Sequence, residues 1–176
     1  MESLKRFITM KLKLKVNESK SAVAEPRERK FLGFSFTNSA SPKRLIAPKA
    51  GKRFKERGRE LTGRTRGISS QRMAQELTLY LRGWIGYFGK CQVPSQLRSL
   101  EEWMRRRLRS VIWTQWQHGR RRFTELRKRG IAVPMAAKTA GGAHGPWRMA
   151  NSPGVAYALP NAYFYSTLGL PRLTVP

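Results

Sequence analysis

The stretch MAQELTLYLRGWIGYFGK, residues 73–90, decides the fold together with LRSLEEWMRRRLRSVIWTQWQHGRRR, residues 97–122. In both stretches apolar residues recur at the three- and four-residue spacing of a helix with one buried face. They are Met73, Leu77, Tyr80, Leu81, Trp84 and Phe88 in the first, and Leu97, Leu100, Met104, Leu108, Ile112 and Trp116 in the second. We therefore expect two helices that pack on each other through these apolar stripes.

Residues that start and stop helices support this division. Ser69, a favoured N-cap residue, precedes the first helix, and Gly89 follows it. Pro94 stands at the first turn of the second helix, where proline is tolerated, and His118 and Gly119 end this helix. Residues 120–129 then predict a third, shorter helix.

The residues before this region predict a short helix and a small antiparallel sheet. Leu12 to Val16 alternates apolar residues with lysine, which is typical of a half-buried strand. A sheet of so few strands needs another element to cover its face. The predicted elements are a helix over residues 2–11 and strands over residues 12–16, 21–24, 30–37 and 44–47.

Two further segments flank the predicted helices. Residues 49–61 form a basic helical segment weakened by Gly51 and Gly58, and the glycine-rich basic loop TGRTRGISS follows at residues 62–70. Residues 131–176 hold six of the ten prolines and three charged residues, so we expect short helical turns lying on the bundle. Their predicted buried residues are Tyr157, Leu159, Phe164, Leu168 and Leu170.

The predicted fold class is mainly α, α+β overall: a three-helix bundle preceded by a small antiparallel β piece. We expect three units, at residues 1–47, 48–130 and 131–176.

The charge of the chain points to a polyanionic partner. Its formal net charge is +26, and residues 43–130 alone contribute +18, so the charge is a patch rather than a tail. Nucleic acid is the expected partner, because such an excess repels itself unless a polyanion neutralises it. There is no apolar run long enough to span a membrane and no secretory signal pattern, so we expect a cytoplasmic protein without membrane association.

The residues for metal-dependent chemistry are scarce. The chain contains no aspartate, and all ten acidic residues are glutamates close to Lys or Arg. Phosphoryl transfer by two metal ions needs carboxylates that hold the ions. Cys91 is the only cysteine, and His118 and His144 stand far apart without neighbouring carboxylates. The sequence therefore predicts no catalytic residues, no metal and no cofactor, and argues against a self-sufficient polymerase or nuclease.

Arginine-rich helix faces are the predicted binding surface. Arginine suits bidentate contacts to phosphate and stacking on unpaired bases, which favours RNA over DNA. Neutralising about six phosphates would give a log affinity against log salt slope of roughly −4 to −5. The alternative is a solvated helix face. The predicted RNA-binding residues are Lys52, Arg53, Arg64, Arg66, Arg105, Arg106, Arg107, Arg109, Arg120, Arg121 and Arg122, with Trp103 and Trp113, which lie off the main apolar stripe, as stacking candidates.

Five motifs in order resemble one family. They are NESKS at 17–21, FLGF at 31–34, LRGWIGYF at 81–88, WMRRRLR at 103–109, and GPWR at 145–148 with Gly169–Leu170. In this order and spacing the chain resembles the C-terminal third of bacterial group II intron reverse transcriptase/maturases. The resemblance covers almost the whole chain.

The resemblance implies roles for the first two units. Residues 1–47 would be the last part of a reverse-transcriptase palm, with Lys20 near the incoming nucleotide. Phe31, Leu32 and Gly33 would belong to the hairpin that grips the primer end. Residues from about 49 to 130 would be the thumb, or maturase-specific domain X, which binds intron RNA and assists its splicing.

The family's Tyr-x-Asp-Asp catalytic motif would lie upstream of Met1, so the resemblance predicts an N-terminally truncated protein without a polymerase site. The predicted function is an RNA-binding maturase module whose partner is group II intron RNA, with primer–template nucleic acid as a further candidate. Three alternatives stay open: one half of a split RNA-directed DNA polymerase that associates with an upstream reverse-transcriptase fragment, a non-functional remnant, and a general basic RNA-binding protein.

Overall fold

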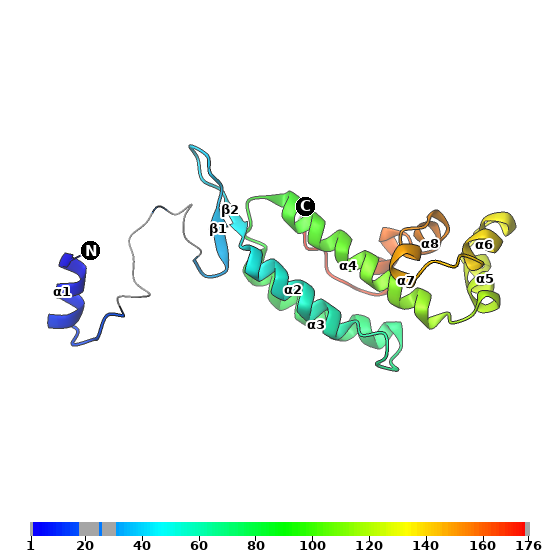
Figure 1. Ribbon diagram of the computed structural model, residues 1–176, viewed down its shortest axis with the longest axis horizontal. Helices are drawn as coiled ribbons and strands as arrows, with labels where there is room; N and C mark the ends of the chain where they lie inside the picture. Colours follow the sequence, from blue (N-terminus) through cyan, green and yellow to red (C-terminus); the bar gives the residue numbers. More distant parts are fainter. Residues whose placement is uncertain (1, 18–24, 26–30, 175–176) are drawn as a thin grey trace.

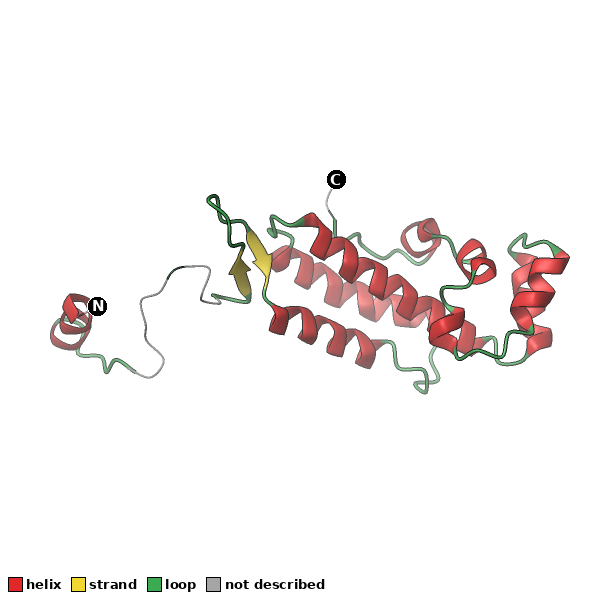
Figure 2. Ribbon diagram, turned by 45° about the horizontal axis from the view of Figure 1, so that its top comes forward, coloured by secondary structure: helices red, strands yellow, loops and turns green. Residues whose placement is uncertain are grey.

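The computed structural model describes residues 2–17, 25 and 31–174. Three long helices dominate it: α2 (Pro48–Leu61), α3 (Ser70–Phe88) and α4 (Pro94–Gln115). They lie side by side in both views (Figures 1 and 2), and their apolar faces belong to one core cluster. The predicted helices at 73–88 and 97–116 are confirmed, and the Ser69 side chain caps α3 by accepting a hydrogen bond from the Arg72 backbone N–H at 3.2 Å.

Phe54 of α2 joins the other two helices. Its side chain is fully buried, and its ring lies 4.7 Å from the Trp84 ring of α3 and 6.3 Å from the Trp103 ring of α4, measured between centroids. The segment at residues 49–61, whose sequence predicts a helix weakened by glycines, therefore contributes buried side chains to the core. Its Gly58 allows close approach, because a Cβ there would come within 2.9 Å of the Trp103 ring.

A two-stranded antiparallel sheet stands at one end of the bundle (Figure 1). Strand β1 (Phe34–Phe36) pairs with β2 (Arg44–Ile46), with Phe34 opposite Ile46. On its other edge β2 is bound by the segment that leads into α4. The Gln92 and Gln96 side-chain oxygens accept hydrogen bonds from the backbone N–H groups of Arg44 and Ile46 at 2.8 and 2.7 Å.

The chain after α4 folds back along the bundle as short helices. They are α5 (Gly119–Lys128), α6 (Val133–Ala140), α7 (Pro146–Met149), α8 (Pro153–Ala158) and a π-helical turn at Tyr163–Thr167. α5 and α6 pack together at the end opposite the sheet, while α7 packs on α4 (Figures 1 and 2). Leu159, Phe164, Leu168 and Leu170 are buried as predicted.

The predicted fold class is confirmed: the described part of the chain is mainly helical with a small antiparallel sheet. Three local predictions fare differently. Residues 12–16 are not a strand, because no described strand lies beside them to share backbone hydrogen bonds. Tyr157 is 69% exposed rather than buried, since its side chain faces away from the core on α8. The strand predicted at 21–24 lies outside the described residues.

Helix α1 (Glu2–Met10) lies apart from the bundle in both views, and none of its residues is buried. Leu4, Phe7 and Met10 are each more than half exposed. The apolar side of this helix therefore makes no part of the core that the bundle shares.

Candidate nucleic-acid interface

The arginines of α4 reach in different directions and bind other parts of the chain. Arg107 turns towards α2, where its Nε donates to the Thr62 hydroxyl at 3.0 Å and its Nη2 to the Thr62 carbonyl at 3.2 Å. Thr62 is fully buried, and its hydroxyl donates to the Gly58 carbonyl. Burial, with a smaller contribution from nearby Arg64, lowers the pKa of the Arg107 guanidinium.

Arg106 turns to the opposite side and holds α7. Its Nε and Nη2 both donate to the Trp147 carbonyl, at 3.2 and 3.1 Å. Its guanidinium also lies over the Trp147 ring, 4.2 Å from the ring centroid. A planar guanidinium stacked on an indole adds a cation–π contact to the hydrogen bonds.

Arg105 and Arg109 hold the last part of the chain. Arg105 Nη1 donates to the Tyr165 hydroxyl at 2.6 Å and forms an ion pair with Glu101 at 3.4 Å, while Tyr165 donates to the Glu101 carboxylate. Arg109 Nε donates to the Leu159 carbonyl at 2.9 Å. Burial, followed by the positive charge of Arg105, lowers the pKa of Arg109.

These contacts give residues 105–109 a structural role beside the predicted RNA-binding one, which stays a prediction. The sequence places them on a face free to meet RNA, but all four arginines are half-buried and donate to groups between 41 and 60 residues away in the sequence. Each long side chain packs its methylene groups against the core and uses its guanidinium to satisfy carbonyl or hydroxyl oxygens. They brace the fold as well as carrying charge.

The two tryptophans predicted to stack on bases are held inside the fold. Trp113 has no exposed surface, lies 5.8 Å from the Trp116 ring and carries Arg122 at 4.6 Å from its ring centroid. A base has no access to that ring in this structure, so we do not count Trp113 among the residues that can contact RNA. Trp103 is half-buried between α2 and α4, with Arg59 at 5.6 Å from its ring centroid.

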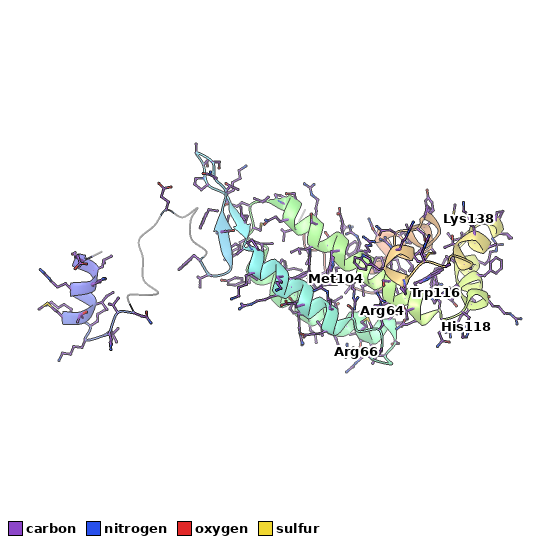
Figure 3. All side chains as sticks on the ribbon, viewed as in Figure 1. Arg64, Arg66, Met104, Trp116, His118 and Lys138 are labelled. Atoms are coloured by element: carbon purple, nitrogen blue, oxygen red, sulfur yellow. The ribbon has the colours of Figure 1, made fainter. Side chains whose placement is uncertain are left out.

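The exposed cations form a surface on α2 and the loop after it. Lys49, Lys52, Arg53 and Arg57 fall on one helix face at spacings of three and four residues, interrupted by Glu56 and Glu60, which pair with Lys52 and Arg57. Arg64 and Arg66 continue it at the α2–α3 loop (Figure 3). The exposed cations of α2 and its following loop are Lys49, Lys52, Arg53, Arg57, Arg64 and Arg66.

Arg66 also fixes its own loop. It donates to the Leu61 carbonyl at 2.6 Å and to the Glu76 carboxylate of α3 at 2.7 Å. This hydrogen bond is the largest cause of the lowered pKa of Glu76. Arg64 donates to Ser110 of α4 at 3.0 Å, so both loop arginines are positioned while remaining exposed.

A second group of exposed cations lies on α5. Arg120 and Arg121 are exposed at its first turn, whereas Arg122 is half-buried over Trp113. Arg129, just after α5, lies over the Trp116 ring and pairs with Glu125 at 2.5 Å, which lowers the pKa of that carboxyl. His118 lies at the turn before α5 (Figure 3). Arg120 and Arg121 are therefore the α5 cations best placed for an external partner.

The residues compared with a primer grip form a tight turn. Phe31 and Phe34 exchange two backbone hydrogen bonds of 2.9 Å, and Leu32 and Gly33 between them have φ values of 49° and 80°. Positive φ at both central residues is typical of a type I′ hairpin turn. Phe31 and Leu32 are 68% and 66% exposed, and the Tyr87 hydroxyl donates to the Leu32 carbonyl at 2.6 Å.

A cavity of about 490 Å³ opens beside this turn, lined by Leu32, Gly33, Arg53, Trp84 and Tyr87 among others. Lys20 lies outside the described residues. Within the described part of the chain, no group of three or more His, Cys, Asp or Glu could hold a metal ion. In the same residues no helix is long and apolar enough to cross a membrane.

Fold and site together define a basic helical module that presents exposed cations on α2, its following loop and α5. Residues 51–130 match the model of the group II intron maturase-specific domain, and the match runs from the first turn of α2 to the end of α5. The match supports the resemblance drawn from the sequence: residues 51–130 are similar to the maturase-specific domain of group II introns. A comparison with curated proteins found no match.

Proposed function

We propose that the chain is the RNA-binding maturase module of a group II intron reverse transcriptase, and that it binds intron RNA to assist splicing without a polymerase site of its own. The observation that carries the proposal is the match over residues 51–130. This segment holds twenty-one basic and six acidic residues. A maturase-specific domain with this charge fits a role in which the RNA supplies the chemistry and the protein stabilises its folded form.

The cations divide between two tasks in this proposal. The exposed residues Lys52, Arg53, Arg64, Arg66, Arg120 and Arg121 contact RNA phosphates. The half-buried residues Arg105, Arg106, Arg107, Arg109 and Arg122 hold the bundle and the extension together, and their charge adds to the attraction for RNA. Residues 48–130 form the RNA-binding unit, residues 131–176 brace it, and residues 1–47 are the last part of a reverse-transcriptase palm.

Specific binding is tested by titrating the full chain against a group II intron RNA and a length-matched structured control RNA. Electrostatic binding to any RNA falls steeply with salt, whereas contacts to a folded shape persist. We expect tighter binding to the intron, with a preference that grows as salt rises. Equal affinity for both RNAs at all salt concentrations would contradict the proposal and leave a general basic RNA-binding protein.

The exposed turn at Phe31 and Leu32 favours a second candidate, half of a split RNA-directed DNA polymerase. Two large apolar side chains that are about two-thirds exposed, next to a cavity, are typical of a surface that another protein segment covers. The test is co-purification of the chain with a separately expressed upstream reverse-transcriptase fragment, followed by a primer-extension assay. No complex with the fragment would rule this candidate out.

A further inference from the structure

A polar cavity of about 510 Å³ lies between α4 and the C-terminal extension. One wall is α4, with the cations Arg105, Arg106 and Arg109 and one carboxylate, Glu102. The other wall comes from Trp147, Asn151 and Asn161 of the extension. The extension lies beyond the residues that match the maturase-specific domain. Cavities of 300–1,000 Å³ are the usual size for small-ligand sites in proteins.

The positive charge in this cavity is incompletely neutralised. Arg105 has a carboxylate partner in Glu101. Arg106 donates to the Trp147 carbonyl, and Arg109 to the Leu159 carbonyl and the Asn161 side-chain oxygen, all of which are neutral acceptors. Glu102 offsets one positive charge of the lining, but among the described residues no ion pair joins it or another carboxylate to Arg106 or Arg109. Two half-buried cations without a paired anion favour an anionic ligand.

Both guanidinium groups keep N–H donors to spare. A guanidinium carries five N–H donors, and the hydrogen bonds of Arg106 use its Nε and Nη2, while those of Arg109 use its Nε and Nη2. Nη1 of each side chain is therefore available. Residues 106 and 109 lie about one turn apart on α4 and line the same cavity, so both guanidinium groups border the site of one ligand.

The rest of the lining suits a base. The Trp147 ring and the Arg106 guanidinium already stack at 4.2 Å, and planar groups of this kind are the surfaces on which unpaired bases stack. Asn151 is exposed at the cavity and offers both a donor and an acceptor to a base edge. The cavity is closed on one side by the folded-back extension, so it suits one nucleotide and not a duplex.

We propose that this cavity binds a single unpaired nucleotide of the bound RNA, with its phosphate on Arg106 and Arg109 and its base against Trp147. The inference rests on the proposed function, because it names one contact of the same RNA-binding protein. It differs from the exposed cations in what it recognises: they bind the backbone at any position, whereas the cavity requires a base that has left its helix.

Two serines on α4 provide a matched pair for the test. Ser99 lines this cavity and Ser95, one helical turn earlier, does not; both are exposed. Ser99→Glu adds a second carboxylate to the lining, besides Glu102, and repels a phosphate without removing a contact of the fold. Ser95→Glu makes the same change of charge outside the cavity. Asn151→Ala is a second variant that removes only the amide.

The experiment titrates the full chain with each of the four ribonucleoside 5′-monophosphates and with inorganic phosphate, and follows tryptophan fluorescence. We expect saturable quenching by the nucleotides, at least a tenfold loss of affinity in Ser99→Glu, a smaller loss in Asn151→Ala, and no change in Ser95→Glu. Trp147→Phe removes the quenching signal if the base stacks there.

Three results would overturn the inference: no saturable nucleotide binding, equal effects of the two glutamate variants, or inorganic phosphate binding as tightly as the nucleotides. Failure of the proposed function is distinguishable, because it shows as equal affinity for intron and control RNA in the wild-type chain. Far-ultraviolet circular dichroism confirms that each variant is folded before it is titrated.

Discussion

Arg107 of α4 donates two hydrogen bonds to Thr62, one to its hydroxyl at 3.0 Å and one to its carbonyl at 3.2 Å. Thr62 is the C-terminal cap of α2 and has no exposed surface. A helix C-terminus leaves carbonyl groups without partners inside the helix, so a cation there completes their hydrogen bonding and interacts favourably with the helix dipole. One side chain of the arginine-rich motif at 103–109 therefore connects α2 to α4.

Arg107→Ala removes this tie. It leaves the buried Thr62 carbonyl without its guanidinium partner, and an unsatisfied buried polar group costs about 1–3 kcal/mol. We expect a loss of that size in the free energy of unfolding, measured by urea denaturation. Arg120→Ala, at an exposed arginine, should change it by less than about 0.5 kcal/mol. Equal stability of the two variants would show that Arg107 is a surface charge.

Phe54→Ala should be among the most damaging single changes in the bundle. The ring is fully buried between Trp84 and Trp103, and truncating a buried phenylalanine costs about 3–5 kcal/mol. Phe31→Ala deletes the same atoms at a position that is 68% exposed, so its effect should be small. Thermal melts of both variants compare the two sites, and a small shift for Phe54→Ala would mean that α2 is not part of the core.

Gly58→Ala and Gly51→Ala make the same change in the same helix with opposite expected outcomes. Alanine is a better helix former than glycine by about 1 kcal/mol, and a Cβ on Gly51 meets nothing within 4 Å, so Gly51→Ala should stabilise the protein. A Cβ on Gly58 meets Trp103 at 2.9 Å and Met104 at 3.0 Å. Overpacking costs about 1–3 kcal/mol, so Gly58→Ala should destabilise it. Urea denaturation of the two variants should therefore give shifts of opposite sign.

Acid should weaken the end of α5. Glu125 has its pKa held below the ordinary value of 4.5, first by its hydrogen bond with Arg129. Since the folded-state pKa is the lower one, this contribution is complete above the unfolded pKa and is lost as pH falls through the folded value. Between about pH 6 and about pH 3, Glu125→Gln should lose less stability than the wild type. Parallel pH profiles of the two proteins would contradict this assignment.

The salt dependence of RNA binding should report the exposed arginines of α5. Arg120→Ala combined with Arg121→Ala removes two phosphate contacts, which should flatten the log affinity against log salt slope by about 1.5. Lys11→Ala combined with Lys15→Ala removes the same charge from an exposed segment outside the matched domain, and should leave the slope nearly unchanged. An equal effect of the two pairs would mean that only net charge matters.

Periodicity sufficed for the long helices and the hairpin, because their signals are local. The apolar stripe from Met73 to Trp84 and the cap at Ser69 are properties of neighbouring residues, and both are confirmed. The strand predicted over residues 30–37 is shorter in the structure, Phe34–Phe36, because Leu32 and Gly33 take positive φ and make a turn at 31–34.

The orientation of the arginines could not be read from the sequence. Residues 105–109 look like an exposed cationic run, but their partners Thr62, Trp147 and Leu159 are remote in sequence and accept through backbone carbonyls, which every residue carries. Phe54 was missed as a core residue for a related reason: its helix is strongly basic, and the buried face that it shares with Leu61 has a glycine, Gly58, between them. The C-terminal extension, rich in proline and aromatic residues, was the one available sign that α4 would be covered.

The two edges of the small sheet differ in whether another strand can pair with them. The Gln92 and Gln96 side chains close the outer edge of β2, so another strand cannot pair there without displacing them. On the other side, Phe31 has already formed one antiparallel rung with Phe34 of β1. A further strand can therefore pair only along the free edge of β1, and the Phe31–Phe34 bridge makes the antiparallel direction the one that continues the existing hydrogen bonds. The sheet can therefore be extended on one side only, by a strand antiparallel to β1.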